Sequence, residues 1–399
     1  AQAAASRDPG SPAAAARPAS LSPQQADAVE RARRPVADYP TSAKYRGELG
    51  VVLRDAGRTA EAVTELQEAV RLDPQNPNLL YELGVTLRAG GMGREAAAQF
   101  DAATRLDARN GTFFDALGNA LLDQGQAEDA VDRLRRAVGL QRDNAAFHRD
   151  LGVALAKAGR PGDAVNELRQ AVLAETRNGG YHIELAQALD AAGRPDEALA
   201  EYRDATTVDA TSAAYHAAYA RDLRAAGRGG EAVGEMKSAV AREPRNAGYH
   251  HDLGLLLRDQ GQSYEAQQEF TEAARLEPGN AAIRFDLGVA LTGTTRRADA
   301  VAELKEAVQL QPGNAGYQDA LGLALKAAGS PTEAMAAFRA AIAAAGDNAK
   351  YHFDLGLVLR DAGLVDEAIV ELEAAVRLDG HNRDYRTELS TLRNRPRNE

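Results

Sequence analysis

Cysteine and tryptophan are both absent from this chain of 399 residues. Without a thiol, the chain forms no disulfide, no thiolate metal site and no cysteine nucleophile. The absence does not fix the compartment, because reducing and oxidising locations both accept such a chain. Aromatic residues make up only 5% of the sequence although hydrophobic residues make up 44%. Small residues must therefore do much of the packing.

Long apolar runs and an excess of basic residues are also missing. No run in the sequence approaches the roughly 18–20 residues of a membrane span. The net charge is −11, whereas binding to nucleic acid phosphates requires clustered lysine and arginine. The sequence therefore predicts neither a membrane span nor a nucleic-acid interface.

The chain contains a repeat of 34 residues. Leu-Gly pairs recur at this spacing or its multiples, from Leu49-Gly50 to Leu355-Gly356. In all ten copies, leucine stands three residues after the glycine position, and alanine stands twelve and nineteen residues after it. A larger apolar residue such as Leu66 lies between the two alanines. Spacings of three, four and seven residues indicate one face of an α-helix.

Each repeat is predicted to contain two helices. The first helix ends at a glycine such as Gly261, which can adopt the left-handed conformation that ends helices. The second helix ends near a proline such as Pro74, and the asparagine that follows, such as Asn76, caps the next first helix. The small alanines let helices approach closely, so we interpret these columns as packing. Thr295 replaces the turn glycine of repeat eight, which predicts an irregular turn there.

These columns resemble the tetratricopeptide repeat, and the resemblance covers residues 43–382. It implies an all-α fold, a right-handed superhelical solenoid of antiparallel helix pairs, with ten full repeats. The first helices would line a concave groove that holds a peptide or partner protein. One subgroup of the family clamps a terminal carboxylate with lysine and asparagine. Its lysine positions hold other residues here, namely Gly47, Tyr81, Asp115, Arg149 and Ile183, so that function is not transferred.

The ends of the chain differ from the repeats. We expect an Ala/Pro-rich tail at 1–21, a lone second helix at 22–42, and a lone first helix with a basic tail at 383–399. The sequence starts at Ala1 with a small-residue stretch, as signal-peptide cleavage would leave it. We therefore expect a secreted or periplasmic protein. A trimmed cytoplasmic chain is the alternative.

A column of histidines occupies the tryptophan position of the family repeat. Its members are His148, His182, His216, His250 and His352. Packed helices lie about 8–10 Å apart, too far for successive histidines to share a zinc ion that needs nitrogens at about 2 Å. We interpret the column as packing, and predict no metal and no cofactor. Protonation near pH 6 is expected to loosen the stack.

A candidate partner groove follows the first helices. Apolar residues just after the glycine position form its floor, and basic residues nearby form its walls. The alternative is a solvated face with ion pairs inside each helix. The predicted groove residues are Val51, Arg54, Val85, Arg88, Val153, Arg224, Leu255, Arg258, Val289, Leu323, Lys326, Leu357 and Arg360.

The two terminal half-repeats suggest a second hypothesis. The C-terminal half of one molecule would complete the N-terminal half of the next, and such a head-to-tail contact that does not close makes a fibre. The residues assigned to these ends are Ala28, Pro40, Tyr385 and Leu389. Simple capping of the array is the alternative.

No phosphate loop, nucleophile triad or two-histidine motif is present in the sequence. The chain is therefore predicted not to be an enzyme. We expect a protein–protein interaction scaffold whose groove binds a partner protein or peptide. The alternative is a structural subunit that assembles with copies of itself into an extracellular fibre.

Overall fold

A computed structural model of the chain describes residues 21–394. Residues 1–20 of the predicted Ala/Pro-rich tail and residues 395–399 of the basic tail lie outside the described residues. In residues 21–394, all regular structure is α-helical, in 22 helices, and every helix is too short or too polar to traverse a bilayer. The all-α prediction and the paired arrangement of helices are confirmed.

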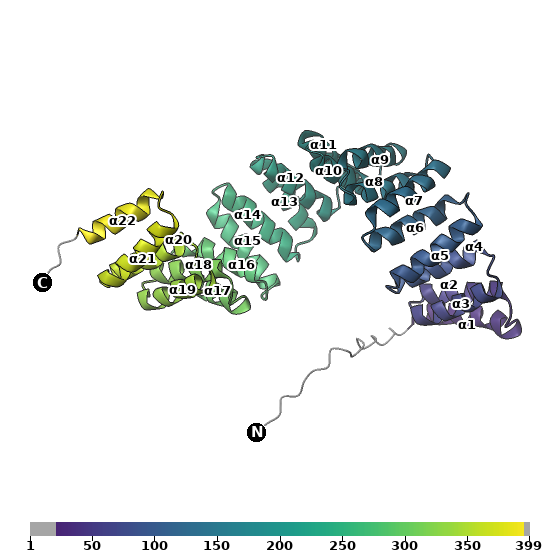
Figure 1. Cartoon of the computed structure of the whole chain (residues 1–399), viewed down its shortest axis with the longest axis horizontal. Helices are drawn as coiled ribbons and strands as arrows, with labels where there is room; N and C mark the ends of the chain where they lie inside the picture. Colours follow the sequence, from purple (N-terminus) through teal and green to yellow (C-terminus); the bar gives the residue numbers. More distant parts are fainter. Residues whose placement is uncertain (1–20, 395–399) are drawn as a thin grey trace, which may run out of the picture. The chain divides into compact units, whose positions relative to one another are not determined.

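First and second helices alternate along the chain (Figure 1). The first helices are α2 (Ala43–Asp55), α4 (Pro77–Ala89), α6 (Gly111–Asp123), α8 (Ala145–Lys157), α10 (Gly179–Ala191), α12 (Ala213–Ala225), α14 (Ala247–Asp259), α16 (Ala281–Thr292), α18 (Ala315–Ala327), α20 (Ala349–Asp361) and α22 (Arg383–Arg393). The second helices are α1 (Pro23–Asp38), α3 (Thr59–Leu72), α5 (Gly93–Leu106), α7 (Ala127–Leu140), α9 (Pro161–Ala174), α11 (Pro195–Val208), α13 (Gly229–Arg242), α15 (Ser263–Leu276), α17 (Arg297–Leu310), α19 (Pro331–Ala344) and α21 (Val365–Leu378).

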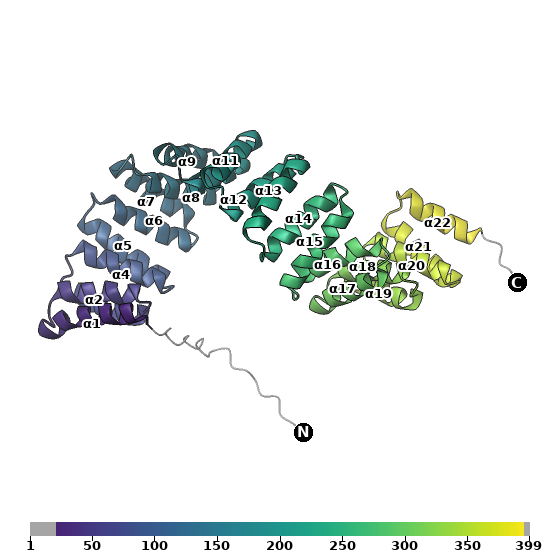
Figure 2. The same ribbon diagram turned by 180° about the vertical axis from the view of Figure 1, so that it is seen from behind.

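The chain divides between Asp204 and Ala205 into two units. Within each unit, a first helix packs on the second helix of its own repeat and on that of the preceding repeat, as α6 does on α7 and α5 (Figure 2). First helices of adjacent repeats also touch one another, from α2 to α10 in one unit and from α16 to α20 in the other. First helices therefore form one continuous face from α2 to α10 and another from α16 to α20.

Capping and turn residues set the helix boundaries as predicted. The side chain of Asn76 accepts a hydrogen bond from the backbone N–H of Asn78 and starts α4, and equivalent asparagines start most first helices. Gly57 joins α2 to α3 with a φ of 76°, which an L-residue with a side chain rarely adopts. In repeat eight, where Thr295 replaces this glycine, α16 is one residue shorter than the other internal first helices.

Small residues allow the close helix contacts that form the core. A Cβ atom placed on Gly84 would lie 2.6 Å from Cε1 of Phe100 on α5. Ala96 and Ala103, on the same helix, are fully buried on either side of that ring. The same three-part contact recurs along the array, so the core is a chain of small interlocking clusters. The predicted packing role of the alanine columns is borne out at these buried positions.

Candidate functional site

The face formed by the first helices carries the predicted apolar row. Each of its members projects from a first helix one residue after the glycine position, and all are half-buried or exposed: Val51, Val85, Val153, Leu255, Val289, Leu323 and Leu357. The most exposed are Val289 at 39% and Leu323 at 37%. They stand on α16 and α18, which touch each other. The row is thus accessible apolar surface on adjacent helices.

The six predicted groove cations are all paired with acids of the next repeat. Three of them reach an acid 28 residues further on, in the pairs Arg54–Glu82 (2.5 Å), Arg258–Asp286 (2.9 Å) and Arg360–Glu388. The other three reach an acid 35 residues further on, in Arg88–Asp123 (2.6 Å), Arg224–Asp259 (2.5 Å) and Lys326–Asp361 (3.5 Å). The predicted charged walls are therefore bridges between repeats.

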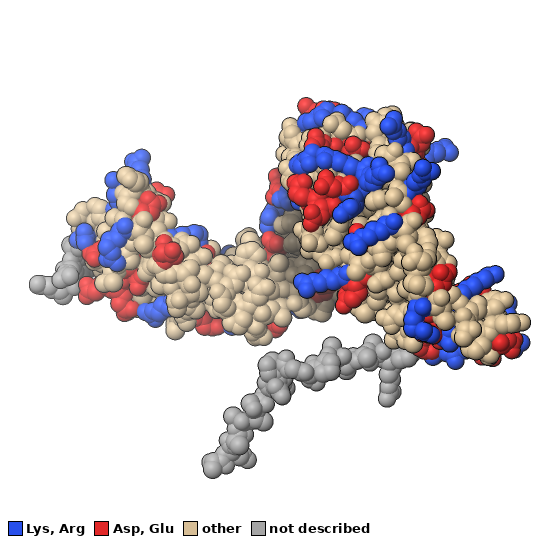
Figure 3. Space-filling view, turned by 45° about the vertical axis from the view of Figure 1, so that its right-hand side comes forward, with Lys and Arg blue, Asp and Glu red and all other residues tan. Residues whose placement is uncertain are grey.

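This pairing leaves the face close to neutral. Lysine, arginine and acidic side chains are interspersed on the surface, as Figure 3 shows for one side of the molecule. Exposed pairs of this kind contribute little to stability, typically about 0–1 kcal/mol each. They do, however, occupy the cations that an acidic partner would need. The apolar row, and not the basic residues, is therefore the part of the face that is open to a partner.

The histidine column forms a second constellation. In every member, Nδ1 lies 2.6–2.7 Å from a glutamate on the second helix of the same repeat. The other nitrogen, Nε2, lies 2.8–3.3 Å from a backbone carbonyl six residues earlier. A neutral imidazole has one N–H donor and a protonated imidazole has two. Each imidazole ring therefore lies between two hydrogen-bond acceptors.

Two arginines occupy the same column in other repeats. Arg46 donates to Glu65 at 2.7 Å and to the carbonyl of Pro40 at 2.7 Å. Arg284 donates to Glu303 at 2.6 Å and to the carbonyl of Pro278 at 2.8 Å. We call these arginines and the five histidines the cation column. At His182, where the bond to Glu201 raises the pKa, the expected loosening on protonation is wrong. For the other four histidines it stays a prediction.

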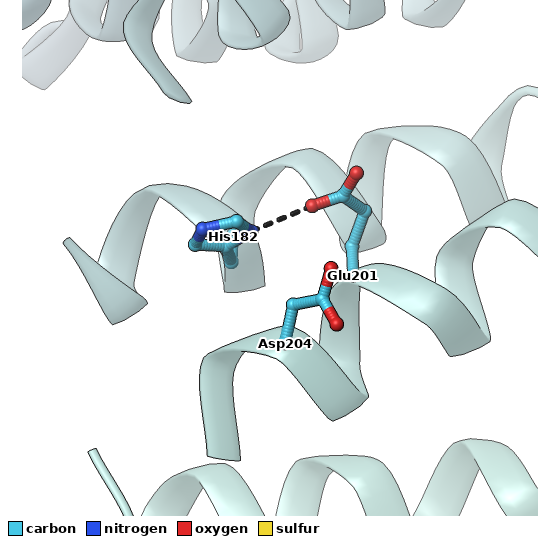
Figure 4. A group of neighbouring side chains, drawn as sticks. All are labelled: His182, Glu201 and Asp204. Atoms are coloured by element: carbon cyan, nitrogen blue, oxygen red, sulfur yellow. Dashed lines mark hydrogen bonds and ion pairs between the residues drawn. The ribbon is translucent and has the colours of Figure 1, made fainter. Parts of the chain in front are cut away.

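His182 also belongs to the one group in the described part of the chain that could hold a metal ion. Its ligand atoms and those of Glu201 and Asp204 lie within 4.8 Å of one another. Figure 4 shows the His182 ring directed at Glu201 on α11, with Asp204 one turn further along that helix. Because the histidine–glutamate contact recurs in four other repeats, we assign it first to the cation column. Hydrogen bonding to Glu201 raises the pKa of His182, although burial opposes the shift.

The residues assigned to the two ends are engaged within their own chain. Tyr385 packs on Phe353, with ring centroids 4.6 Å apart, and Leu389 is buried. The carbonyl of Pro40 accepts the bond from Arg46, and Ala28 is half-buried.

Completion of the half-repeats by another copy has an electrostatic obstacle. Pairing α22 with α1 of a second copy in repeat register would place Arg386 in the cation column opposite Arg31 in the glutamate column. Both side chains are exposed in the single chain. Where these two columns hold a cation and a glutamate, the contact is favourable, whereas two arginines repel each other.

Sequence reasoning missed a third constellation on the first-helix face. Asp115 on α6, Asn119 on α6 and Asp150 on α8 lie in hydrogen-bonding contact, beside Arg149. In the sequence, Asp115 stands out only as a departure from the carboxylate clamp. Its recurrence at Asp319, six repeats later, was the available clue.

Together, the paired helices and the continuous first-helix face define a helical-repeat scaffold. Family models described as TPR repeat or tetratricopeptide repeat match residues 50–91, 116–180, 155–221, 251–315 and 320–383. The chain belongs to the tetratricopeptide-repeat family. No curated protein matches the sequence.

Several solved structures are similar to parts of the chain. Pseudomonas aeruginosa pilF is 21% identical over 53% of this chain and 97% of its own, with a TM-score of 0.45. YrrB, described as a TPR protein with an unusual peptide-binding site, is 20% identical over 45% of this chain and 93% of its own, with a TM-score of 0.40. The thermophilic TPR protein TTC0263 of Thermus thermophilus is 26% identical over 46% of this chain and 99% of its own, with a TM-score of 0.38. At these scores, the family assignment rests on the repeat models alone.

Proposed function

We propose that the chain is a non-enzymatic scaffold whose first-helix face binds a segment of a partner protein. The observation that carries this proposal is the accessible apolar row, led by Val289 and Leu323 on the touching helices α16 and α18. A row of this kind matches the side chains of an extended or helical segment laid along a groove. The neighbouring cations are held in bridges between repeats, so the row is expected to supply most of the affinity.

The spacing of the row suits an extended segment. Packed helices lie about 8–10 Å apart, and an extended chain in the polyproline II conformation advances about 3.1 Å per residue with three residues per turn. Every third residue of the partner would therefore stand over a successive member of the row. We expect segments with an apolar residue at every third position to bind best.

Selection of peptides from a random pool by the full-length chain tests this proposal. Val289→Asp is expected to weaken binding of the selected peptides by at least about tenfold, equivalent to about 1.4 kcal/mol. Val370→Asp is the matched control, because Val370 is 60% exposed on the second helix α21. Equal effects of the two substitutions, or no selected peptide at all, would contradict the proposal.

Head-to-tail assembly into an extracellular fibre remains a second hypothesis, and secretion remains a prediction with it. The approach of Arg386 to Arg31 in the simple register is the reason that we favour the scaffold. Light scattering on the full chain and on a chain lacking residues 1–42 separates the two functions. Fibre assembly predicts large particles that disappear on truncation.

A further inference from the structure

Two aspartates from consecutive repeats meet on the first-helix face of the first unit. The Nδ2 atom of Asn119 donates to Oδ2 of Asp115 at 3.2 Å and to Oδ2 of Asp150 at 2.9 Å. The other oxygen of Asp150 accepts from Arg149 at 2.7 Å. A neutral amide therefore bridges the two carboxyl groups. Among the described residues, no ion pair joins Asp115 to a lysine or arginine.

The same pair of aspartates recurs in the second unit with a lysine between them. Asp319 and Asp354 lie 204 residues, or six repeat lengths, after Asp115 and Asp150. The Nζ atom of Lys350 lies 2.7 Å from Oδ2 of Asp319 and 2.6 Å from Oδ2 of Asp354. The two sites share one further feature, because Oδ1 of Asp115 and Oδ1 of Asp319 are both buried without a hydrogen-bond partner in the described structure. Leu323 and Phe353 stand where the first site has Asn119 and Arg149.

The first site lacks this lysine. The residue equivalent to Lys350 is Ala146, which is exposed. Burial and the negative charge of Asp150 raise the pKa of Asp115 to about 8. Burial also raises the pKa of Asp319, but there the ammonium of Lys350 opposes the shift. The chain thus contains one version of the carboxylate pair bridged by a lysine and one, the unfilled pair, bridged only by the neutral amide of Asn119.

A hollow of about 520 Å³ leads to the unfilled pair. Asp115 and Asn119 line it together with Tyr81, Val85 and Arg88. Arg88 is held by Asp123 at 2.6 Å. The apolar parts of Tyr81 and Val85 suit the methylene stem of a lysine, which packs on such surface while its charged end reaches a polar partner.

We propose that Asp115 and Asp150 bind the ammonium group of a lysine side chain from the partner segment, in the place that Lys350 takes between Asp319 and Asp354. This inference rests on the proposed scaffold function and adds a specificity-determining contact to it. The pattern at Lys350 favours an ammonium over a guanidinium, because one nitrogen with three donors bridges both carboxylates. One oxygen of the Asp150 carboxylate, Oδ1, already accepts a hydrogen bond from the guanidinium of Arg149.

Adding a lysine to the chain and removing the lysine from the peptide together test the proposal. Ala146→Lys is expected to fill the pair from within and to weaken lysine-containing selected peptides by at least about tenfold. Replacing the peptide lysine by norleucine should cost the same factor on the natural chain and nothing on the Ala146→Lys variant. Ala214→Lys is the control, because it adds the same charge at the exposed equivalent position two repeats later, where Ile183 and Ala218 replace the two aspartates.

A small probe separates this proposal from the scaffold proposal. Butylammonium chloride is expected to shift the carboxyl ¹³C resonance of Asp115 in the full chain, and tetramethylammonium chloride, which has no N–H donor, is not. A butylammonium response without any peptide binding supports the ammonium site and overturns the scaffold. Peptide binding that depends on Val289 but is unaffected by norleucine and by Ala146→Lys overturns the ammonium site. An equal response to both salts also overturns it.

Discussion

Arg46 and His148 hold the same position in their repeats and contact equivalent groups. Arg46 donates to a glutamate nineteen residues later and to a backbone carbonyl six residues earlier, and the two ring nitrogens of His148 lie 2.7 and 2.8 Å from the equivalent atoms. The carbonyl belongs to the connection from the preceding second helix. One side chain therefore joins both helices of its repeat to the repeat before it.

The pH dependence of stability follows from this geometry. The pKa of His182 is raised in the folded chain, chiefly by its bond to Glu201. Its contribution is therefore fully present below the unfolded pKa of about 6.5 and is lost as the pH rises through the folded pKa. We expect the denaturation midpoint to fall between pH 6 and pH 8. A midpoint that rises over this interval in urea titrations would contradict the assignment.

Exchange of the column residue isolates its contribution. His182→Leu leaves Glu201 without its donor and is expected to cost about 1.5–3 kcal/mol at pH 6. His182→Arg reproduces the arrangement at Arg46 and should keep stability while removing this residue's pH dependence. Gln318→Leu serves as the control, since Ala337 replaces the glutamate in that repeat. Unfolding curves in which the two leucine variants lose equal stability would count against a cationic role.

Asp115 is expected to destabilise the chain at neutral and alkaline pH. Its folded pKa of about 8 lies above the unfolded value, so folding favours the protonated carboxyl and stability falls as the pH rises between these values. Asp115→Asn should stabilise the chain at pH 9 by about 1.4 kcal/mol or more, the value of one pKa unit. We use one unit because part of the side chain is exposed. Calorimetry at pH 5 and pH 9 checks this, and no gain at pH 9 would refute it.

Helices touch closely at the glycine position of each repeat. A methyl group added there should therefore lower stability, whereas one added at an exposed glycine should raise it. Gly84→Ala would force its Cβ against Phe100, and such overpacking typically costs about 1–3 kcal/mol. Gly139→Ala, at an exposed site in α7 with nothing within 4 Å, should stabilise by up to about 1 kcal/mol. Thermal unfolding of the two variants distinguishes packing from helix propensity. Similar shifts would show that the contact is not tight.

The fold was predictable because each repeat contains the residues that begin and end its own helices. Asn76, Gly57 and the alanine columns act through neighbours within one repeat, and a period of 34 residues makes that local information redundant. The candidate site was only partly predictable. The row at Val289 follows from helical periodicity. The pairing of Arg54 with Glu82 depends on how successive first helices lie against one another, which no single repeat reveals.

At His182, the sign of the pH effect was mispredicted for a related reason. A histidine in the sequence indicates a titratable group, but its two acceptors decide which charge state folding favours. Those acceptors are a glutamate on another helix and a carbonyl in a turn. The bridging role of Lys350 between Asp319 and Asp354 depends equally on contacts across repeats.

The order of residues in the cation column has a mechanical consequence. Four consecutive repeats use histidine, from His148 to His250, and arginine takes over at Arg284, as it does earlier at Arg46. Alkaline solution removes charge from imidazolium but leaves guanidinium intact. The repeat that contains His182, whose pKa is raised in the folded chain, should then open to proteases before the repeats held by Arg46 and Arg284. Acidic solution would make the same repeat more resistant, so the pH of the medium selects where along its length the chain is cleaved first.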